Sequence, residues 1–172
     1  METVIRSCTP ADAAALALVG QATFLQTYAD VLPASDILAH CQGEHAEAYY
    51  AAKLAEPAYG FWIAELSETG APIGYAMLCP PDLPVATTEA DLELKRIYLL
   101  HRFHGTGLGA GLMAMAANAA RQRGAERLLL GVYGGNTRAM AFYARQGFAP
   151  AGERKFKVGA NEYDDLVLAR AL

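Results

Sequence analysis

Apolar residues recur along this chain with two different periods, and the changes of period divide it into helices and strands. From Gly107 to Arg123 they return every three or four positions, which predicts an amphipathic helix that Gly124 ends. A second helix is predicted from Thr9-Pro10, a cap residue followed by proline in the first turn, to about Tyr28. Shorter helices are expected within 31–56, with Ser35 as a candidate cap, and over 137–146, before Gly147.

Short apolar runs between turn residues predict the strands. Residues 59–66 and 73–78 flank the turn Glu68-Thr69-Gly70 and predict a hairpin. Further strands are expected at 4–5, 92–100 and 127–132 and on both sides of Gly159, and three prolines make 80–90 a loop. Strands joined partly by hairpins and partly by helices predict an α/β (α+β) fold, a mixed sheet with helices on both faces. No repeat or linker interrupts the pattern, so we expect one domain over 1–172.

Composition narrows the classes of partner. A chain of 172 residues that is 53% hydrophobic can bury a full core. Its net charge of −4 provides no basic surface for nucleic acid or an anionic membrane, and a cationic partner is easier to accommodate. The three cysteines, Cys8, Cys41 and Cys79, are far apart and lack zinc-site spacing, which favours reduced thiols and a cytoplasmic protein. We expect no signal peptide. We also expect no transmembrane helix, because no uninterrupted apolar run approaches about 20 residues.

The most informative segment is the glycine turn that links the strand 92–100 to the helix from Gly107. Its glycines at 105, 107 and 109 leave backbone N–H groups free to face outward at a helix N-terminus, which predicts a pyrophosphate site. The turn also fits the dinucleotide fingerprint G-x-G-x-x-G/A. Against that interpretation, five residues separate Leu99 from Gly105, and no acidic residue ends the next strand. A P-loop is excluded because no Gly-Lys-Ser/Thr follows.

Two motifs together identify a family resemblance. Arg102-Phe103-His104-Gly105-Thr106-Gly107 resembles the R/Q-x-x-G-x-G/A motif of the GNAT (Gcn5-related N-acetyltransferase) superfamily, and Asn136, Ala139, Tyr143 and Gly147-Phe148 match its second conserved stretch. The resemblance spans roughly residues 59 to 170. It implies the GNAT fold, a mostly antiparallel sheet of about six or seven strands that splay after the fourth. It also implies an enzyme in which a small amine attacks the thioester of acetyl-CoA directly.

Within that superfamily the chain looks closest to the bacterial Pai-type spermidine/spermine acetyltransferases, through Leu92–Tyr98, Leu130–Tyr133 and Asp165–Ala169. This resemblance implies a polyamine as acceptor. Ribosomal-protein N-terminal acetyltransferases commonly carry glutamate where Gly131 stands here. An antibiotic, an amino acid or a protein N-terminus is the alternative acceptor, and a non-catalytic acetyl-CoA sensor is the alternative class. The resemblance to this family also implies a homodimer.

The resemblance also assigns roles to residues. Tyr143 would protonate the departing coenzyme A thiolate, although a tyrosine on a helix face is otherwise a core residue. Glu93 would act as general base through water, or else it is an ordinary strand residue. Asn136 would contact coenzyme A, cap its helix, or do both. The residues implied to bind coenzyme A are Ile97, Tyr98, Leu99, Arg102, Gly105, Thr106, Gly107, Leu108, Gly109, Ala110, Asn136 and Tyr143.

Other groups carry weaker signals. We expect no metal, because the pairs His101/His104 and Cys41/His45 lack further ligands. An aromatic cluster is expected in the core, with a wall of the acceptor pocket as its alternative: Tyr49, Tyr50, Tyr59, Phe61 and Trp62. Several acidic residues either attract a polyamine or lie on a solvated surface: Asp82, Glu89, Asp91, Asp164 and Asp165.

Overall fold

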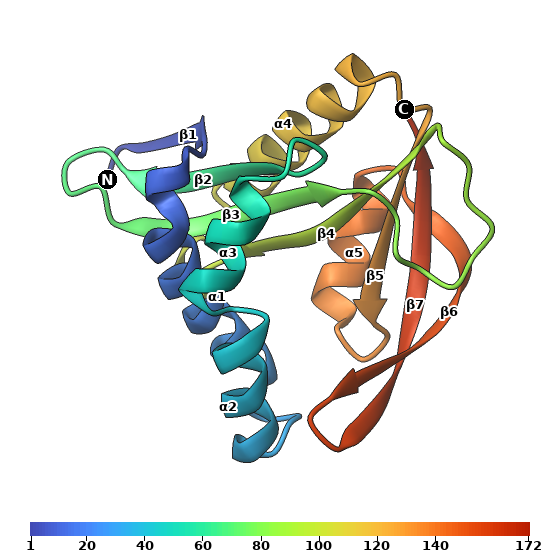
Figure 1. Ribbon diagram of the computed structural model, residues 1–172, viewed down its shortest axis with the longest axis horizontal. Helices are drawn as coiled ribbons and strands as arrows, with labels where there is room; N and C mark the ends of the chain where they lie inside the picture. The colour runs from blue at the N-terminus through green and yellow to red at the C-terminus, as the bar shows by residue number, and fades with distance from the viewer.

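A computed structural model describes residues 1–172 and arranges seven strands in one sheet, in the order β1-β2-β3-β4-β5-β7-β6 (Figure 1). The pair β4 and β5 is parallel, and every other neighbouring pair is antiparallel. The strands are β1 (Thr3–Ser7), β2 (Gly60–Leu66), β3 (Pro72–Cys79), β4 (Asp91–Leu99), β5 (Arg127–Tyr133), β6 (Ala149–Val158) and β7 (Asn161–Ala171).

Helices cover both faces of this sheet, which confirms the predicted fold class. One face is covered by α1 (Ala13–Tyr28) and α3 (Glu47–Leu54), with α2 (Ala34–Gly43) beside β6. The other face is covered by α4 (Leu108–Gln122) and α5 (Thr137–Arg145). Two short 3₁₀ turns, η1 (Pro10–Asp12) and η2 (His101–Phe103), precede α1 and α4. None of these helices combines the length and the apolar character needed to cross a membrane.

Turn residues set the helix ends largely as predicted. Gly124 and Gly147 follow α4 and α5 with φ of 82° and 86°, a conformation that glycine adopts without a steric penalty. The expectation for Ser35 was wrong, because α2 already begins at Ala34. The residue before it, Pro33, has φ −59° and ψ 147°, so its extended backbone ends the preceding loop two residues earlier than a serine cap at Ser35 requires.

The two faces of the sheet bury separate cores. On the α4 side, Leu112, Ala116 and Ala120 are fully buried against the sheet. On the α1 side, the core includes Tyr50 and Phe61, which confirms the aromatic cluster as mainly core rather than pocket wall. Complete burial of one large apolar side chain contributes about 1.5–3 kcal/mol, so these layers fix the positions of the helices that carry the site.

The sheet divides at β4. The pairing with β5 covers only Asp91 to Glu93, after which β4 stays with β3 while β5 stays with β7 (Figure 1). Leu94 and Arg96 pair with Leu78 and Met77, adjacent residues of β3, so Lys95 is an extra residue. Such a bulge increases the local twist and bends the strand, which turns β4 away from β5. The predicted splay after the fourth strand is therefore confirmed.

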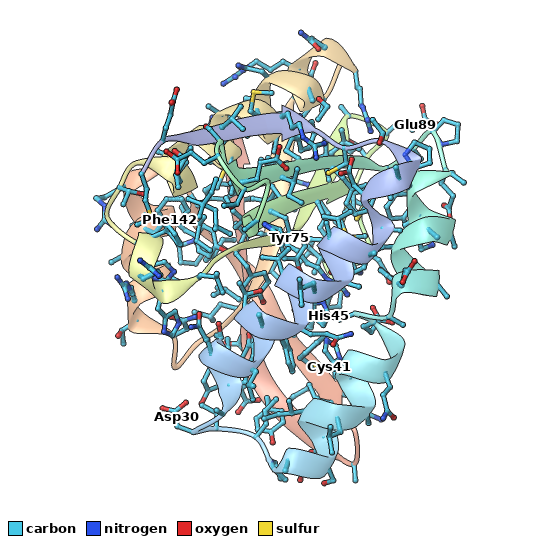
Figure 2. The ribbon with its side chains drawn as sticks, turned by 90° about the vertical axis from the view of Figure 1, so that its left-hand side faces the viewer. Asp30, Cys41, His45, Tyr75, Glu89 and Phe142 are labelled. Carbon is cyan, nitrogen blue, oxygen red and sulfur yellow. The ribbon has the colours of Figure 1, made fainter.

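A buried polar network attaches α2 and α3 to β4. The guanidinium of Arg96 donates to the Tyr50 hydroxyl at 3.0 Å and to the Glu44 carbonyl and carboxylate at 2.8 and 3.0 Å. Tyr50 also contacts His45 Nδ1 at 2.9 Å and donates to the Tyr75 hydroxyl at 3.1 Å. Figure 2 labels Tyr75 and His45 beside α1. This network holds the helical wall that faces the opening between β4 and β5.

Candidate functional site

A cleft of about 980 Å³ lies where β4 and β5 separate. Its walls come from α1 and α2 on one side and from the glycine turn, α5 and β6 on the others. A volume near the upper end of the range for small-molecule sites can hold a large, elongated ligand.

The glycine turn forms one end of this cleft, with Gly105, Gly107, Gly109 and Ala110 among its lining residues. Gly105 and Gly107 have φ of 80° and 90°, and no atom lies within 4 Å of a Cβ built on either. The backbone N–H groups from Gly105 to Ala110 donate to no protein acceptor. Unpartnered N–H groups at the N-terminus of α4 are suited to an anion, since the helix dipole adds a partial positive charge there.

Contacts to neighbouring elements fix the turn in place. The His101 N–H donates to Gln26 Oε1 of α1 at 3.0 Å, and the Thr106 hydroxyl donates to the Phe103 carbonyl at 2.7 Å. His104 Nε2 donates to the Leu99 carbonyl at 2.9 Å. Burial lowers the pKa of His104, so this imidazole is neutral at pH 7. The turn is therefore tied both to α1 and to the end of β4.

Ile97, Tyr98 and Leu99 line the cleft from β4. The edge of β4 away from β3 has no strand partner beyond Glu93, and β5 is likewise unpaired on its facing edge. Unpaired N–H and C=O groups on an exposed strand edge can bind an extended ligand as an added strand would.

Tyr143 reaches the same cleft from α5 and is 9% exposed. Burial raises the pKa of its hydroxyl above the ordinary value, and the neighbouring Tyr98 adds to that shift, so Tyr143 carries its proton at pH 7. The Asn136 side chain accepts from the Ala139 N–H at 3.1 Å at the start of α5 and also lines the cleft. Figure 2 shows Phe142 beside the ribbon of the glycine turn, where a Cβ on Gly109 would meet its ring.

Glu93 lies at the point where β4 and β5 part, since it is the last residue of β4 to pair with β5. It is 1% exposed and lines the cleft. Its Oε2 accepts from the Asp82 N–H at 2.8 Å. The loop that carries Asp82 is held against the sheet by Leu83, which packs on Leu129. A buried carboxylate is therefore held in a defined orientation beside the separated strands.

Three predicted donor-site residues do not line the cleft. The guanidinium of Arg102 lies over the Phe103 ring at 5.3 Å from its centre, and the residue is exposed. Thr106 faces the turn itself, and Leu108 packs against the α4 core. Arg138 and Arg145, which the sequence did not single out, do line the cleft from α5 and are the side-chain cations at this wall.

The sequence also gave no signal for Arg154. A Cβ on Gly131 would collide with the Arg154 guanidinium, so this arginine fills the space above Gly131 on β5. Its Nη2 donates to Asp165 Oδ2 at 2.6 Å. Both residues line the cleft, together with Tyr28 of α1. Arg154 reaches Gly131 only because β6 pairs with β7 and β7 with β5, a long-range arrangement with no local sequence pattern.

Comparison with known proteins agrees with this geometry. The profile of the Acetyltransferase (GNAT) family matches residues 25–148. An uncharacterised N-acetyltransferase of Mycobacterium tuberculosis is 35% identical over 161 residues, which are 94% of this chain and 98% of that protein. An uncharacterised N-acetyltransferase of Lactobacillus delbrueckii subsp. lactis is 28% identical over 155 residues, covering 90% and 88% of the two chains.

Solved structures show the same fold. The PaiA N-acetyltransferase of Thermoplasma acidophilum, in complex with coenzyme A, superposes with a TM-score of 0.82 at 19% identity, and 100% of both chains is covered. The ribosomal-protein-S18-alanine N-acetyltransferase of Escherichia coli gives a TM-score of 0.69 at 19% identity, with 99% of this chain and 94% of that one covered. At these identities the likeness concerns the fold and not the acceptor.

Proposed function

The chain belongs to the acetyltransferase (GNAT) family and is an N-acetyltransferase that uses acetyl-CoA as donor, and on this premise we propose that it acetylates a small amine by direct attack on the thioester. The observation that carries the proposal is the row of unpartnered N–H groups from Gly105 to Ala110 at the end of a cleft between separated strands. A polyamine is the acceptor class to which the Pai-type resemblance points.

The donor would lie along the cleft in an extended form. We propose that its diphosphate contacts the N–H groups of the glycine turn, with Arg138 and Arg145 adding positive charge from α5. The pantetheine arm would pair with the free edge of β4 at Ile97 to Leu99. In this arrangement the thioester end points toward Tyr143 and the opening between β4 and β5.

The chemistry needs two proton transfers. An aliphatic ammonium has a pKa of about 10.4, so only about one molecule in a few thousand is a free nucleophile at pH 7. We propose that Glu93 takes a proton from the acceptor through water. The amine nitrogen then forms a bond to the thioester carbonyl carbon, the C–S bond breaks, and Tyr143 gives its proton to the thiolate. The neutral, buried hydroxyl of Tyr143 supports the role of acid.

The test is release of coenzyme A thiol from acetyl-CoA across a panel of amines, with mass spectrometry of the products. The panel contains spermidine, spermine, simple alkylamines, amino acids, an aminoglycoside and a peptide with a free N-terminus. We expect equal amounts of thiol and N-acetylated amine for at least one small amine. Tight donor binding without acetylation of any amine in the panel would contradict the proposal and favour a sensor.

Two further properties are proposals of the same kind. Because all seven strands belong to one sheet, we propose that residues 1–172 form a single domain. Cys8, Cys41 and Cys79 are free thiols, which supports a reducing compartment such as the cytosol. A homodimer stays a prediction from the resemblance.

A further inference from the structure

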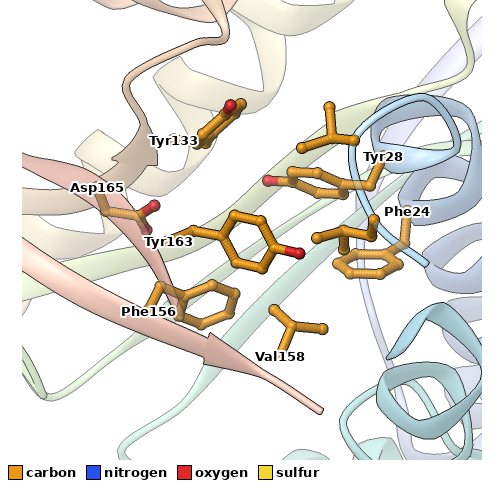
Figure 3. Close-up of a pocket in the computed structure, with 9 residues that line it drawn as sticks. Phe24, Tyr28, Tyr133, Phe156, Val158, Tyr163 and Asp165 are labelled. Atoms are coloured by element: carbon orange, nitrogen blue, oxygen red, sulfur yellow. The ribbon is translucent and has the colours of Figure 1, made fainter. Parts of the chain in front are cut away.

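A small aromatic pocket adjoins the cleft, between α1 and the β6–β7 hairpin. Its volume is about 10 Å³, and eight of its nine lining residues are hydrophobic. Figure 3 shows the rings of Tyr28, Tyr133 and Tyr163 around it, with Phe24 at one end and the Asp165 carboxylate at the other. Asp165 is the one carboxylic acid that lines this pocket.

The Asp165 carboxylate is buried and only half satisfied. Its side chain is 4% exposed, and its Oδ2 accepts from Arg154 Nη2 at 2.6 Å. The other oxygen, Oδ1, is buried and has no hydrogen-bond partner, and the same holds for Arg154 Nε. A native structure rarely leaves a buried carboxylate oxygen without a donor, so this atom calls for an explanation. A ligand that supplies a donor in the pocket would complete it.

Resting on the proposed acetylation of a small amine, we infer that Asp165 Oδ1 anchors a primary ammonium group of the acceptor among the rings of Tyr28, Tyr133 and Tyr163. A primary ammonium supplies the missing donors and a positive charge. The faces of aromatic rings attract cations, so the tyrosines add to this preference. Asp165 is thus a residue that determines acceptor specificity.

The size of the pocket restricts the cation. A volume of about 10 Å³ holds roughly one water-sized group. A terminal –NH₃⁺ has about that size, whereas a trimethylammonium group is several times larger. The methylene chain behind the ammonium would lie against the aromatic rings. The anchor therefore selects an unbranched primary amine, a class that includes polyamines.

Arg154 supports this role rather than competing for it. It binds the other carboxylate oxygen, and its guanidinium lies over the Phe156 ring at 4.9 Å from the centre, which holds Asp165 in one orientation. Burial raises the pKa of Asp165, while Arg154 favours the ionised form. Asp165 on β7 pairs with Tyr133 at the end of β5, and both Asp165 and Tyr143 line the cleft. The anchor and the proposed acid thus face the same cleft.

The experiment measures the KM for n-butylamine and for spermidine in Asp165→Asn, with Asp164→Asn as matched control. Asp164 is the adjacent residue, exposed and paired with Lys155, so its change removes the same charge outside the pocket. We expect the amine KM to rise about 10- to 100-fold in Asp165→Asn, the range for losing a hydrogen bond to a charged group. The acetyl-CoA Kd should not change, and Asp164→Asn should keep the wild-type KM. An unchanged amine KM in Asp165→Asn overturns the inference.

Arg154→Met separates the anchor from a merely structural ion pair. If Asp165 binds the amine, its carboxylate stays in the pocket when Arg154 is removed, so Arg154→Met raises the amine KM by less than Asp165→Asn does. If Asp165 exists only to pair with Arg154, both variants raise the amine KM equally, which overturns the inference. Should Asp165→Asn fail to fold, the double variant Arg154→Met/Asp165→Asn removes both charges together, and it is expected to show the same rise in KM relative to Arg154→Met.

Calorimetry keeps this inference distinct from the proposed function. n-Butylamine is titrated into protein saturated with coenzyme A, beside N,N,N-trimethylbutylammonium. Binding of n-butylamine that Asp165→Asn weakens supports the anchor even if no amine is acetylated, a result that would refute only the proposed function. Acetylation that Asp165→Asn leaves unaffected would refute only the anchor. Equal binding of the trimethyl compound would overturn the preference for a primary amine.

Discussion

The variant Ala110→Glu places a negative charge where the diphosphate is proposed to bind. Ala110 is the third residue of α4, is exposed, and lines the cleft. An acidic residue in the first turn of a helix favours folding by about 0.3–1 kcal/mol, because it complements the helix dipole. The same charge repels a bound phosphate. Stability and donor affinity are therefore expected to move in opposite directions.

The matched control is Ala114→Glu. Ala114 is exposed, lies one turn further along α4 and does not line the cleft. Two charges about 4 Å apart interact by about 1 kcal/mol in bulk water. With about two charges on the diphosphate, the penalty is about 2 kcal/mol, or about a 30-fold weaker acetyl-CoA Kd. The Tm of Ala110→Glu should exceed that of Ala114→Glu by about 1–4 °C.

Calorimetry with acetyl-CoA and thermal unfolding of both variants measure these effects. Raising the ionic strength to about 1 M shortens the Debye length to about 3 Å, so the difference in Kd between the two variants should shrink. Equal acetyl-CoA affinity in Ala110→Glu and Ala114→Glu at low salt would refute the placement of the diphosphate at this helix end.

Three further variants or conditions test other parts of the site. Tyr143→Phe keeps the buried ring and removes the proton, so kcat is expected to fall about 100-fold or more with little change in acetyl-CoA KM, and an unchanged kcat would exclude the acid role. In Glu93→Gln the side-chain oxygen can still accept the hydrogen bond from the Asp82 N–H, but the side chain cannot take a proton, so kcat/KM should fall about 100-fold or more. If the pH profile of kcat/KM does not change in this variant, Glu93 is not the general base. Burial lowers the pKa of His40 to about 4 and that of His45 to about 2, and the charge of Arg96 adds to both shifts. Between these lowered pKa values and the ordinary value of about 6.5, the two histidines are protonated in the unfolded chain but not in the folded one. The free energy of unfolding should therefore fall as pH drops below about 6.5, by up to about 1.4 kcal/mol per pH unit for each histidine. Thermal unfolding between about pH 7.5 and about pH 5 checks this, and a flat profile there would contradict it.

Local patterns predicted most of the fold, because a helical period or a turn signal is contained within a few neighbouring residues. Helical periodicity and Gly124 marked α4, and the turn at Glu68-Thr69-Gly70 marked the β2–β3 hairpin. The start of α2 was missed by two residues, because the fixed φ of Pro33 decided it rather than the preference of Ser35 for caps.

The candidate site was predictable in part. The glycine turn is contiguous in sequence, so its chemistry could be inferred before its geometry was known. Arg154 could not be found this way, because its place over Gly131 depends on three strands pairing in one order. The burial of Asp165 is equally non-local, since in sequence it looks the same as its exposed neighbour Asp164.

The central claim is that the amides from Gly105 to Ala110 bind the diphosphate of acetyl-CoA, and backbone amide NMR tests it most directly. In the free protein these N–H groups have no protein acceptor, so they should exchange rapidly with solvent. On addition of acetyl-CoA we expect large shifts and slowed exchange at these amides, while those of the distant turn at Gly70 stay unchanged. Saturation with acetyl-CoA that leaves the amides of the glycine turn unshifted and unprotected would contradict the account.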